Sequence, residues 1–371
     1  MPPFDRPLLL VPAPGIPVLG PSGASAHVRG VAGALRPVAI VAARGEDHRG
    51  AHGAVDAPIV SVGVPGWPAW LDRYREYTEV WAARRVARAA VRLAPTLVWE
   101  RHTLFSDAGW KVHAATGAPW ILEVNAPPVA ERLRYETVRQ RGWAEAWERD
   151  VLTAAPRVIA VSAWLADWLR GLGCRDVRHV PNGVAPHVGD REGTRRALGL
   201  QDRFVVGFLG SMKPWHGVER LPALLDALPD AVGLVVGDGP VRVAHPRIVH
   251  AGHVSEARAA DLVAAMDVGL APYGPDAPPW FCPLKILAYR AQGTPVVATD
   301  VGDCRLLVGN AGTIVGPSDA LVDAVRAWQG HRAAPNSRTW DHVVTEACAD
   351  TPATTSVTVR WGSAPGAGAA G

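Results

Sequence analysis

Residues 204–218 read FVVGFLGSMKPWHGV. The run begins with apolar and small residues that are typical of a buried strand, and a glycine-containing loop with one lysine follows. A helical stretch comes next, near residues 217–228. A strand, a loop and a helix in this order favour a βαβ unit, whose crossover connection makes neighbouring strands parallel.

The same order of elements occurs on both sides of this stretch. Upstream, apolar runs at residues 8–11, 38–42, 96–99, 120–124, 158–161 and 178–180 alternate with helical stretches such as 25–35, 74–93 and 163–172. Downstream, predicted strands at 232–236, 248–250, 268–271 and 295–298 are separated by predicted helices at 257–266 and 283–292. A polar passage rich in glycine and arginine, from residue 184 to about 199, divides the two series. We therefore expect two α/β domains, each with a doubly wound parallel sheet.

The predicted domain limits follow from this division. The N-terminal domain covers residues 1–185 and the C-terminal domain covers residues 186–337. A last helix is expected over residues 338–348, with a return to the N-terminal domain as one option. Residues 349–371 are rich in alanine and glycine, and we expect a disordered tail there because these residues offer little surface to bury.

Composition excludes several classes of protein. The chain has 371 residues, of which 48% are hydrophobic and 20% charged, which suits two globular cores. A net charge of +3 from scattered residues does not favour nucleic acid as a partner. The four cysteines show no zinc or disulfide spacing. No apolar run is long enough to cross a membrane, and the first residues do not resemble a signal peptide, so we expect a cytoplasmic protein.

Three loops that follow predicted strands are candidates for an anion site, since ligands of parallel sheets bind at the carboxyl ends of strands. The first leads through Gly23 into a helix start, and it lacks the dinucleotide pattern GxGxxG. The second contains Lys213 and His216; alternatively, Trp215 packs in the core and Lys213 is solvated. The third places Lys285 in the first turn of a helix. The chain has only three lysines, and two of them, Lys213 and Lys285, lie in these loops.

Together these segments resemble the retaining GT-B glycosyltransferases of family 4. The likeness extends from about residue 12 to residue 348 and rests on the order and spacing of short segments. They are residues 15–17, 22–30, 98–102, 122–127, 161–162, 180–184, 210–217, 236–240 and 283–285.

The resemblance implies a nucleotide-sugar donor held mainly by the C-terminal domain. It also implies an acceptor, lipid-linked, polysaccharide or small-molecule, held mainly by the N-terminal domain. The resemblance places Gly23, Ser211, Lys213, His216 and Lys285 at the donor diphosphate, His253 and Val254 near the nucleobase, and Glu100, Glu123 and Asn125 on the acceptor side.

The same resemblance suggests catalytic roles for Lys213, Lys285 and His102. His102 would meet the transferred sugar, or it would be a hydrogen-bonded structural histidine. A buried, satisfied carboxylate is likewise the alternative for Glu123, and Asp238 is read as structural. The implied reaction retains configuration and uses neither a metal nor another cofactor.

One departure from the family pattern concerns two glutamates. They usually stand eight positions apart, at the places that Trp280 and Ala288 occupy here. The second commonly binds the donor ribose or sugar. A catalytically degenerate protein that binds sugar nucleotides therefore stays open as an alternative, as does a sugar-nucleotide epimerase.

Two tryptophan-rich stretches, residues 64–70 and 143–147, suggest either a surface for the acceptor, peripheral contact with a membrane, or core packing.

Overall fold

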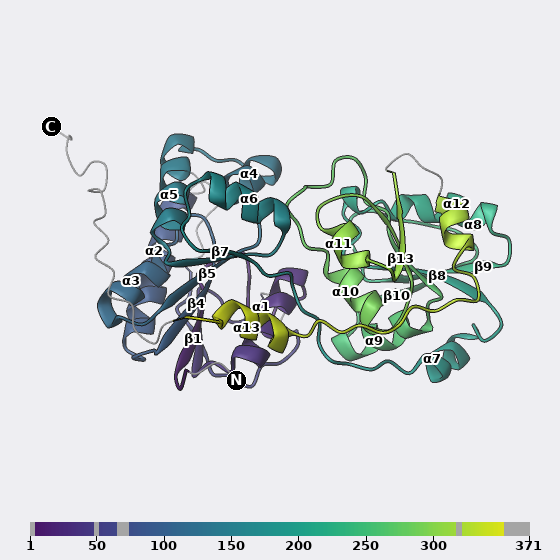
Figure 1. Ribbon diagram of the computed structural model, residues 1–371, viewed down its shortest axis with the longest axis horizontal. Helices are drawn as coiled ribbons and strands as arrows, with labels where there is room; N and C mark the ends of the chain where they lie inside the picture. Colours follow the sequence, from purple (N-terminus) through teal and green to yellow (C-terminus); the bar gives the residue numbers. More distant parts are fainter. Residues whose placement is uncertain (1–3, 48–51, 65–73, 317–320, 352–371) are drawn as a thin grey trace.

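The computed structural model describes the chain except for residues 1–3, 48–51, 65–73, 317–320 and 352–371. It contains two parallel sheets, each in its own half of the molecule (Figure 1). The first has seven strands in the order β3-β2-β1-β4-β5-β6-β7, and the second has six in the order β10-β9-β8-β11-β12-β13. In both sheets the strand order reverses at the first strand of the domain, which confirms two doubly wound domains.

The N-terminal sheet is flanked by helices on both faces. Its strands are β1 (Pro7–Val11), β2 (Ala39–Ala42), β3 (Ile59–Ser61), β4 (Leu97–Arg101), β5 (Trp120–Val124), β6 (Arg157–Ala160) and β7 (Val177–His179). Its helices are α1 (Gly23–Leu35), α2 (Arg75–Val91), α3 (Ala108–Thr116), α4 (Pro128–Tyr135), α5 (Arg141–Ala154) and α6 (Ala163–Gly171).

The C-terminal sheet is built in the same way. Its strands are β8 (Phe204–Leu209), β9 (Ala231–Val236), β10 (Ile248–Gly252), β11 (Val268–Ala271), β12 (Val296–Thr299) and β13 (Gly312–Val315). Its helical segments are α7 (Arg191–Leu198), the short 3-10 turns η2 (Pro214–His216) and η3 (Val218–Arg220), α8 (Leu221–Ala227), α9 (Glu256–Ala265), α10 (Leu284–Ala291), α11 (Cys304–Val308) and α12 (Leu321–Arg326). The last helix of the chain is α13 (Trp340–Cys348).

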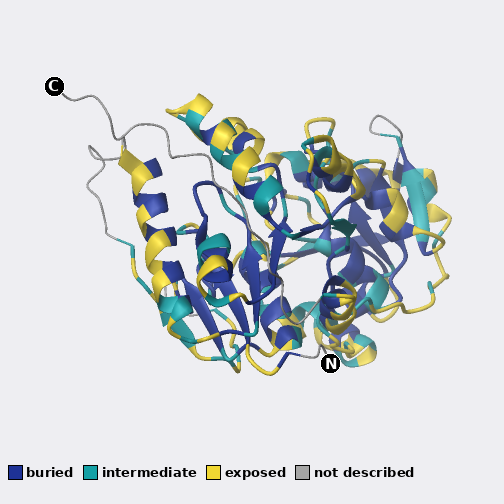
Figure 2. Ribbon diagram, turned by 60° about the vertical axis from the view of Figure 1, so that its left-hand side comes forward, coloured by how far each residue is buried: buried dark blue, intermediate teal, exposed yellow. Residues whose placement is uncertain are grey.

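The central strands are buried along their whole length, because helices cover both faces of each sheet (Figure 2). This burial explains their continuous apolar runs. The helices bury one side and expose the other (Figure 2). The four cysteines are free and buried. No helix in the described ranges is long and apolar enough to cross a membrane.

The structure differs from the sequence prediction at two edge strands and in the polar passage. Strands β3 and β13 were not predicted, because they are short and only partly buried. The passage from 184 to 199 contains α7, which Asp190 caps through the Gly193 N–H. Arg191 and Arg195 of α7 form ion pairs with Asp267 at 2.5 and 3.1 Å. These charged contacts join α7 to the C-terminal domain, although its sequence lacks an apolar face.

Helix α13 crosses back from the C-terminal domain and lies beside α1 (Figure 1). Its residues Trp340, Val343 and Val344 join the core under one face of the N-terminal sheet. Gly30 of α1 makes this contact close, because a Cβ atom there would lie 2.1 Å from the Trp340 indole nitrogen. Arg157 also holds the end of the helix by donating to the Ala347 carbonyl.

Further contacts join the two domains directly. Ser162 Oγ donates to the Trp280 carbonyl at 2.8 Å. Asp303 accepts from the Ala163 N–H at 3.1 Å and pairs with His179 Nε2 at 2.9 Å. The domains are therefore held at a defined separation, with the carboxyl ends of their central strands available for a site between them.

Candidate functional site

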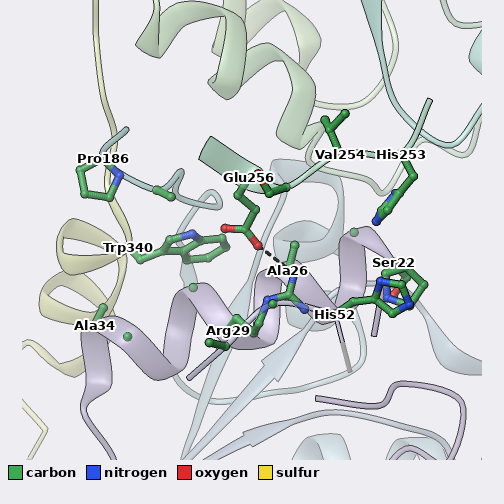
Figure 3. Close-up of a pocket in the computed structure, with 18 of the residues that line it drawn as sticks. Ser22, Ala26, Arg29, Ala34, His52, Pro186, His253, Val254, Glu256 and Trp340 are labelled. Carbon is green, nitrogen blue, oxygen red and sulfur yellow. Dashed lines mark hydrogen bonds and ion pairs between the residues drawn. The ribbon is translucent and has the colours of Figure 1, made fainter. Parts of the chain in front are cut away.

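A pocket of about 800 Å³ lies between the two domains (Figure 3). Its wall on the N-terminal side is the start and the small-residue face of α1, and its wall on the C-terminal side is the loop that leads into α9. Gly23, His253 and Val254 all line it, so the structure brings together residues that the sequence assigned to the diphosphate and to the nucleobase.

The start of α1 gives this pocket a positive end. Ser22 caps the helix, and its hydroxyl accepts from the Ser25 N–H at 3.1 Å. Gly23 is the first helical residue, and a Cβ atom there would meet nothing within 4 Å. The unsatisfied N–H groups of a helix start attract anions, and open space next to them leaves room for one.

An ion pair spans the pocket from one domain to the other. Arg29 Nη2 of α1 lies 2.8 Å from Glu256 Oε1, in the first turn of α9, and this pair is the dashed line in Figure 3. The rings of His52 and His253 also meet edge to face, with centroids 5.7 Å apart. The two walls of the pocket are thus linked, and neither link was expected from the sequence.

A second cluster gathers Lys285, His216 and Lys213 around the loop after β8. Lys285 is the second residue of α10 and is 7% exposed. Its Nζ lies 3.9 Å from the centroid of the Phe208 ring and has no hydrogen-bond partner within the described part of the chain. Burial lowers the pKa of Lys285 to about 7. A cation held this way without an anion costs free energy that a bound phosphate would recover.

His216 faces this lysine as a neutral ring. Burial, followed by the charges of Lys285 and Lys213, lowers the pKa of His216 to about 2. Its Nδ1 accepts from the Lys213 N–H at 3.3 Å, so the other ring nitrogen carries the proton. Lys213 itself is exposed, and its Nζ is 5.8 Å from the centroid of the Trp215 ring. Ser211 is also exposed in this loop.

The backbone of this loop rests on the glycine-rich turn after β9. A Cβ atom at Gly239 would lie 1.8 Å from the Ser211 carbonyl oxygen, and one at Gly237 would lie 2.2 Å from the Gly210 carbonyl oxygen. Met212 has φ 40, an uncommon value for a residue other than glycine, and its carbonyl accepts from the Val241 N–H at 3.1 Å. Asp238 binds the Gly239 N–H and Arg242, which agrees with a structural role.

The lysine cluster and the pocket are separate features of the interdomain region. None of Lys213, His216 and Lys285 lines the 800 Å³ pocket. Lys213 does interact electrostatically with Glu131 of α4, so its loop faces the N-terminal domain.

His102 and Asn125 lie at the carboxyl ends of β4 and β5, two inner strands of the N-terminal sheet. Burial lowers the pKa of His102 to about 3, so its ring is neutral. Neither ring nitrogen has a hydrogen-bond partner in the described residues, and the same is true of Asn125 Nδ2. The described residues therefore provide no hydrogen-bond partner for a structural role of the His102 ring. Both side chains can still form hydrogen bonds with a ligand.

Glu100 and Glu123 lie inside the N-terminal domain and are occupied by protein groups. Glu100 accepts from the Ser106 hydroxyl at 2.6 Å and from the Gly109 N–H at 2.9 Å, and burial raises its pKa to about 7. Glu123 binds His27 Nε2 at 2.7 Å and the Trp99 indole at 3.2 Å. Glu123 matches its alternative of a buried, satisfied carboxylate, and Glu100 is occupied by protein groups as well. Neither arrangement supports the predicted contact with an acceptor.

Arg101 is a residue that the sequence did not single out. It ends β4, is 8% exposed, and its Nε and Nη1 have no hydrogen-bond partner among the described residues. Its position at the end of a predicted strand was the available signal. An arginine is common on protein surfaces, however, and only packing shows that this one is buried.

Trp280 and Ala288 occupy the positions of the two family glutamates, and neither of them lines the 800 Å³ pocket. Ala288 is a half-buried residue of α10, one turn after Lys285. Trp280 is half-buried, and its ring lies 5.8 Å from that of Trp164 across the domain boundary.

Of the tryptophan-rich stretches, residues 65–70 lie outside the described residues. The ring centroids of Trp143 and Phe105 are 4.4 Å apart, which favours core packing for the second stretch.

The family descriptions that match this chain cover both domains. "Glycosyltransferase Family 4" matches residues 21–188, and "Glycosyl transferases group 1" matches residues 203–329. A curated relative, a GDP-mannose-dependent alpha-mannosyltransferase from Mycolicibacterium smegmatis, is 30% identical over 205 residues. That match covers 53% of this chain and 52% of the relative, so it spans about half the length of each protein.

Solved structures with the same fold cover nearly all of the chain. HepE from Anabaena, solved with UDP-glucose, is 17% identical and has a TM-score of 0.63 over 92% of this chain and 95% of its own. Sucrose-phosphate synthase from Thermosynechococcus elongatus is 18% identical and has a TM-score of 0.66 over 94% and 95%. At this identity the likeness concerns the fold.

Proposed function

Since this chain belongs to the glycosyltransferases of family 4 and group 1, with the GT-B fold, we propose that it transfers a sugar from a nucleotide-sugar donor to an acceptor. The observation that carries the proposal is the buried, unpartnered Lys285 next to His216 and Lys213. A diphosphate would supply the negative charge that this cluster lacks. The nucleobase would lie toward His253 and Val254, which line the interdomain pocket. HepE, which has the same fold, was solved with UDP-glucose.

We propose that the reaction retains configuration by displacement on one face of the sugar. The acceptor hydroxyl oxygen forms a bond to the anomeric carbon while the bond from that carbon to the phosphate oxygen breaks. The proton of the hydroxyl passes to the departing phosphate oxygen. Negative charge grows on the diphosphate, and Lys285 and Lys213 would stabilise it electrostatically. His102, which is neutral and unpartnered, would donate to a hydroxyl of the transferred sugar.

Metal independence is part of the same proposal. In the described part of the chain, no group of three or more histidine, cysteine, aspartate or glutamate residues could hold a metal ion. The proposal itself rests on the two lysines, which supply positive charge where a metal ion would otherwise do so.

Lys213→Ala is expected to lower the rate of sugar transfer at least tenfold, because it removes a cation from the proposed diphosphate site. One lost charged hydrogen bond is worth about 1.5–3 kcal/mol. The donor is first identified by thermal stabilisation with a panel of nucleotide sugars, and transfer is then measured with that donor. Lys111→Ala is the matched control, since Lys111 pairs with Asp107 in α3 and should leave the rate unchanged. Equal rates in both variants would refute the site.

Ala288→Glu distinguishes an active enzyme from the degenerate alternative. If the missing carboxylate limits donor binding, the variant should bind the donor about tenfold more tightly in calorimetry, through new hydrogen bonds to sugar or ribose hydroxyls. An unchanged affinity together with normal transfer by the natural chain would mean that other groups already hold these hydroxyls. Donor binding without transfer to any acceptor would instead support the degenerate protein.

We further propose peripheral contact with an anionic membrane through α2. Tyr77 and Trp81 are 53% and 40% exposed, and Arg84 and Arg88 continue the same face of the helix. Exposed aromatic rings beside arginines suit the interface of a bilayer with anionic lipids. In co-sedimentation, vesicles with phosphatidylglycerol should bind the protein and pure phosphatidylcholine vesicles should not. Arg84→Glu with Arg88→Glu should abolish binding; retention of binding would refute this surface.

A further inference from the structure

An ion pair and a ring contact join the two domains across the interdomain pocket. Arg29 Nη2 lies 2.8 Å from Glu256 Oε1, and the ring centroids of His52 and His253 are 5.7 Å apart. All four residues line the pocket, and the ion pair lies between the end near Trp340 and the end near His52 (Figure 3). A movement that separates the domains at this pocket must therefore break both contacts.

Arg29 is held in place by its own domain. Its Nη1 donates to the Gly20 carbonyl at 2.9 Å and to the Val18 carbonyl at 3.3 Å. Gly53 leaves room for the guanidinium group, because a Cβ atom there would lie 2.7 Å from Arg29 Nε. The Arg29 side chain is only 10% exposed. Since these contacts already fix its position, the bond to Glu256 costs less side-chain entropy than a pair of mobile surface groups would.

The ring contact is anchored to the same part of the N-terminal domain. The His52 N–H donates to the Leu19 carbonyl at 2.8 Å, so His52 and Arg29 both bind the backbone of residues 18–20. The chain then leads through Ser22 into α1, whose start gives the pocket its positive end. The two interdomain contacts thus act together on the loop before α1.

On the other side of the pocket, Glu256 belongs to the segment that we propose at the nucleobase. It is the first residue of α9, where Ser255 caps the helix by accepting from the Arg258 N–H at 3.3 Å. His253 and Val254 come directly before the cap. The Glu256 side chain is 48% exposed, so water can replace Arg29 as its partner when the pair separates.

The remaining contacts between the domains lie away from this pocket. Ser162 and Asp303, which join the domains at the ends of β6 and β7, do not line it. The chain crosses between the domains next to Val184 and next to Thr339, and these two residues form a parallel bridge. A rotation at the crossings would open the pocket while the chain stays paired there. The ion pair is therefore placed to control this opening.

We propose that Arg29 and Glu256 are positioning residues whose ion pair latches the two domains over the nucleotide of the donor. This assignment rests on the proposed transferase function and concerns how its donor is held. The pair stabilises the closed arrangement, in which the nucleotide contacts both domains. It separates when the donor enters and when the nucleoside diphosphate leaves. Loss of the pair shifts the population toward an open arrangement and weakens nucleotide binding in proportion to the closed fraction that is lost.

The first test is a double-mutant cycle in the full chain, with Arg29→Gln, Glu256→Gln and both together. UDP and GDP are titrated by calorimetry, and the nucleotide that the natural chain binds more tightly is used. Each single variant should bind it about fivefold more weakly. The double variant should bind it no more weakly than the single variants, because either substitution already breaks the pair.

Glu192→Gln is the matched control. Glu192 is an exposed carboxylate in the first turn of α7, and it does not line the pocket. Like Glu256→Gln, this substitution removes a negative charge from a helix start, so both variants lose the same favourable interaction with the helix dipole. The control should keep its nucleotide affinity within about twofold of the natural value.

The second test needs no ligand. Small-angle X-ray scattering of the ligand-free protein should give a larger radius of gyration for Glu256→Gln than for the natural chain and for Glu192→Gln. Saturation with the chosen nucleotide should remove most of this difference, because it favours the closed arrangement. Should Arg29→Gln fail to fold, Glu256→Gln carries both tests, since its side chain is half-exposed.

Three results would overturn the latch. The first is an unchanged radius of gyration or an unchanged nucleotide affinity in Glu256→Gln. The second is additive losses in the double variant, since Arg29 would then act only on its own loop. The third is tighter nucleotide binding by Glu256→Gln, which would place the carboxylate in the space of the nucleotide. Failure of the transferase proposal is a separate readout, because the natural chain would then bind neither UDP nor GDP, whereas the ligand-free scattering would still report on the latch.

Discussion

Lys285→Met is expected to lower sugar transfer at least 100-fold and, at the same time, to make the ligand-free protein more stable. The lost ammonium group would no longer stabilise the charge that develops on the diphosphate, and removal of one such group commonly costs two orders of magnitude or more. Methionine has a similar length and suits the surrounding Phe208 and Tyr273 rings. It also removes a buried cation that has no anion.

The pH dependence of stability follows from the lowered pKa of Lys285 and shows why its replacement should stabilise the ligand-free protein. Burial lowers the pKa of Lys285 from 10.5 to about 7 on folding. Between these values the unfolded chain binds more protons than the folded one, so the stability of the natural protein rises with pH. The free-energy cost of burying the protonated lysine is complete below pH 7, where it amounts to roughly 5 kcal/mol, and it is absent above pH 10.5.

Urea unfolding of the natural protein and of Lys285→Met at pH 6 and at pH 10 tests the stability, and a transfer assay tests the activity. The gain in the free energy of unfolding should be large at pH 6 and small at pH 10. A less stable variant with a transfer rate within threefold of normal would contradict both parts, since Lys285 would then be a structural lysine with an unseen partner.

Gly239→Ala is expected to lower kcat/KM about 100-fold by moving the loop that carries Lys213. The new Cβ atom would lie 1.8 Å from the Ser211 carbonyl oxygen, which is backbone and cannot rotate away. The loop must therefore shift by more than an ångström, and a displacement of that size in a substrate-positioning element costs about two orders of magnitude. The midpoint of thermal unfolding should fall as well, because the turn and the loop share this contact.

Gly142→Ala is the control for this substitution. Gly142 lies in α5, and a Cβ atom there meets nothing within 4 Å. Alanine favours helix by up to about 1 kcal/mol, so this variant should be at least as stable as the natural chain and fully active. Normal kcat/KM in Gly239→Ala would show that the loop after β8 does not position the donor.

The fold class was predictable because the alternation of strands and helices leaves a strong trace in apolar residues. Strands such as β1 and β9 are buried along their length, and their sequences are continuous apolar runs. Helix α7 left no such trace. Its buried Arg195 is satisfied by Asp267, a residue far away in sequence, and no local pattern reveals that ion pair.

The site was predictable to the extent that it depends on loops after strands. That rule drew attention to Gly23, His216 and Lys285 before any contact was known. It could not show that Lys285 and Arg101 lack hydrogen-bond partners, because the presence of a partner depends on packing between segments that are distant in sequence. The same limit applies to Glu100 and Glu123, because the sequence does not show that Ser106 and His27 are their hydrogen-bond partners.

The position of α13 has a consequence for how the protein is made. Its side chains complete the hydrophobic core next to β1 and β4, yet the ribosome translates them after the entire C-terminal domain. The N-terminal domain therefore leaves the ribosome with an apolar surface exposed. The helix that covers this surface is synthesised more than 150 residues later. Expression of residues 1–185 alone would leave that surface open and prone to aggregation, whereas a circular permutant that joins α13 ahead of β1 would deliver a closed N-terminal core first.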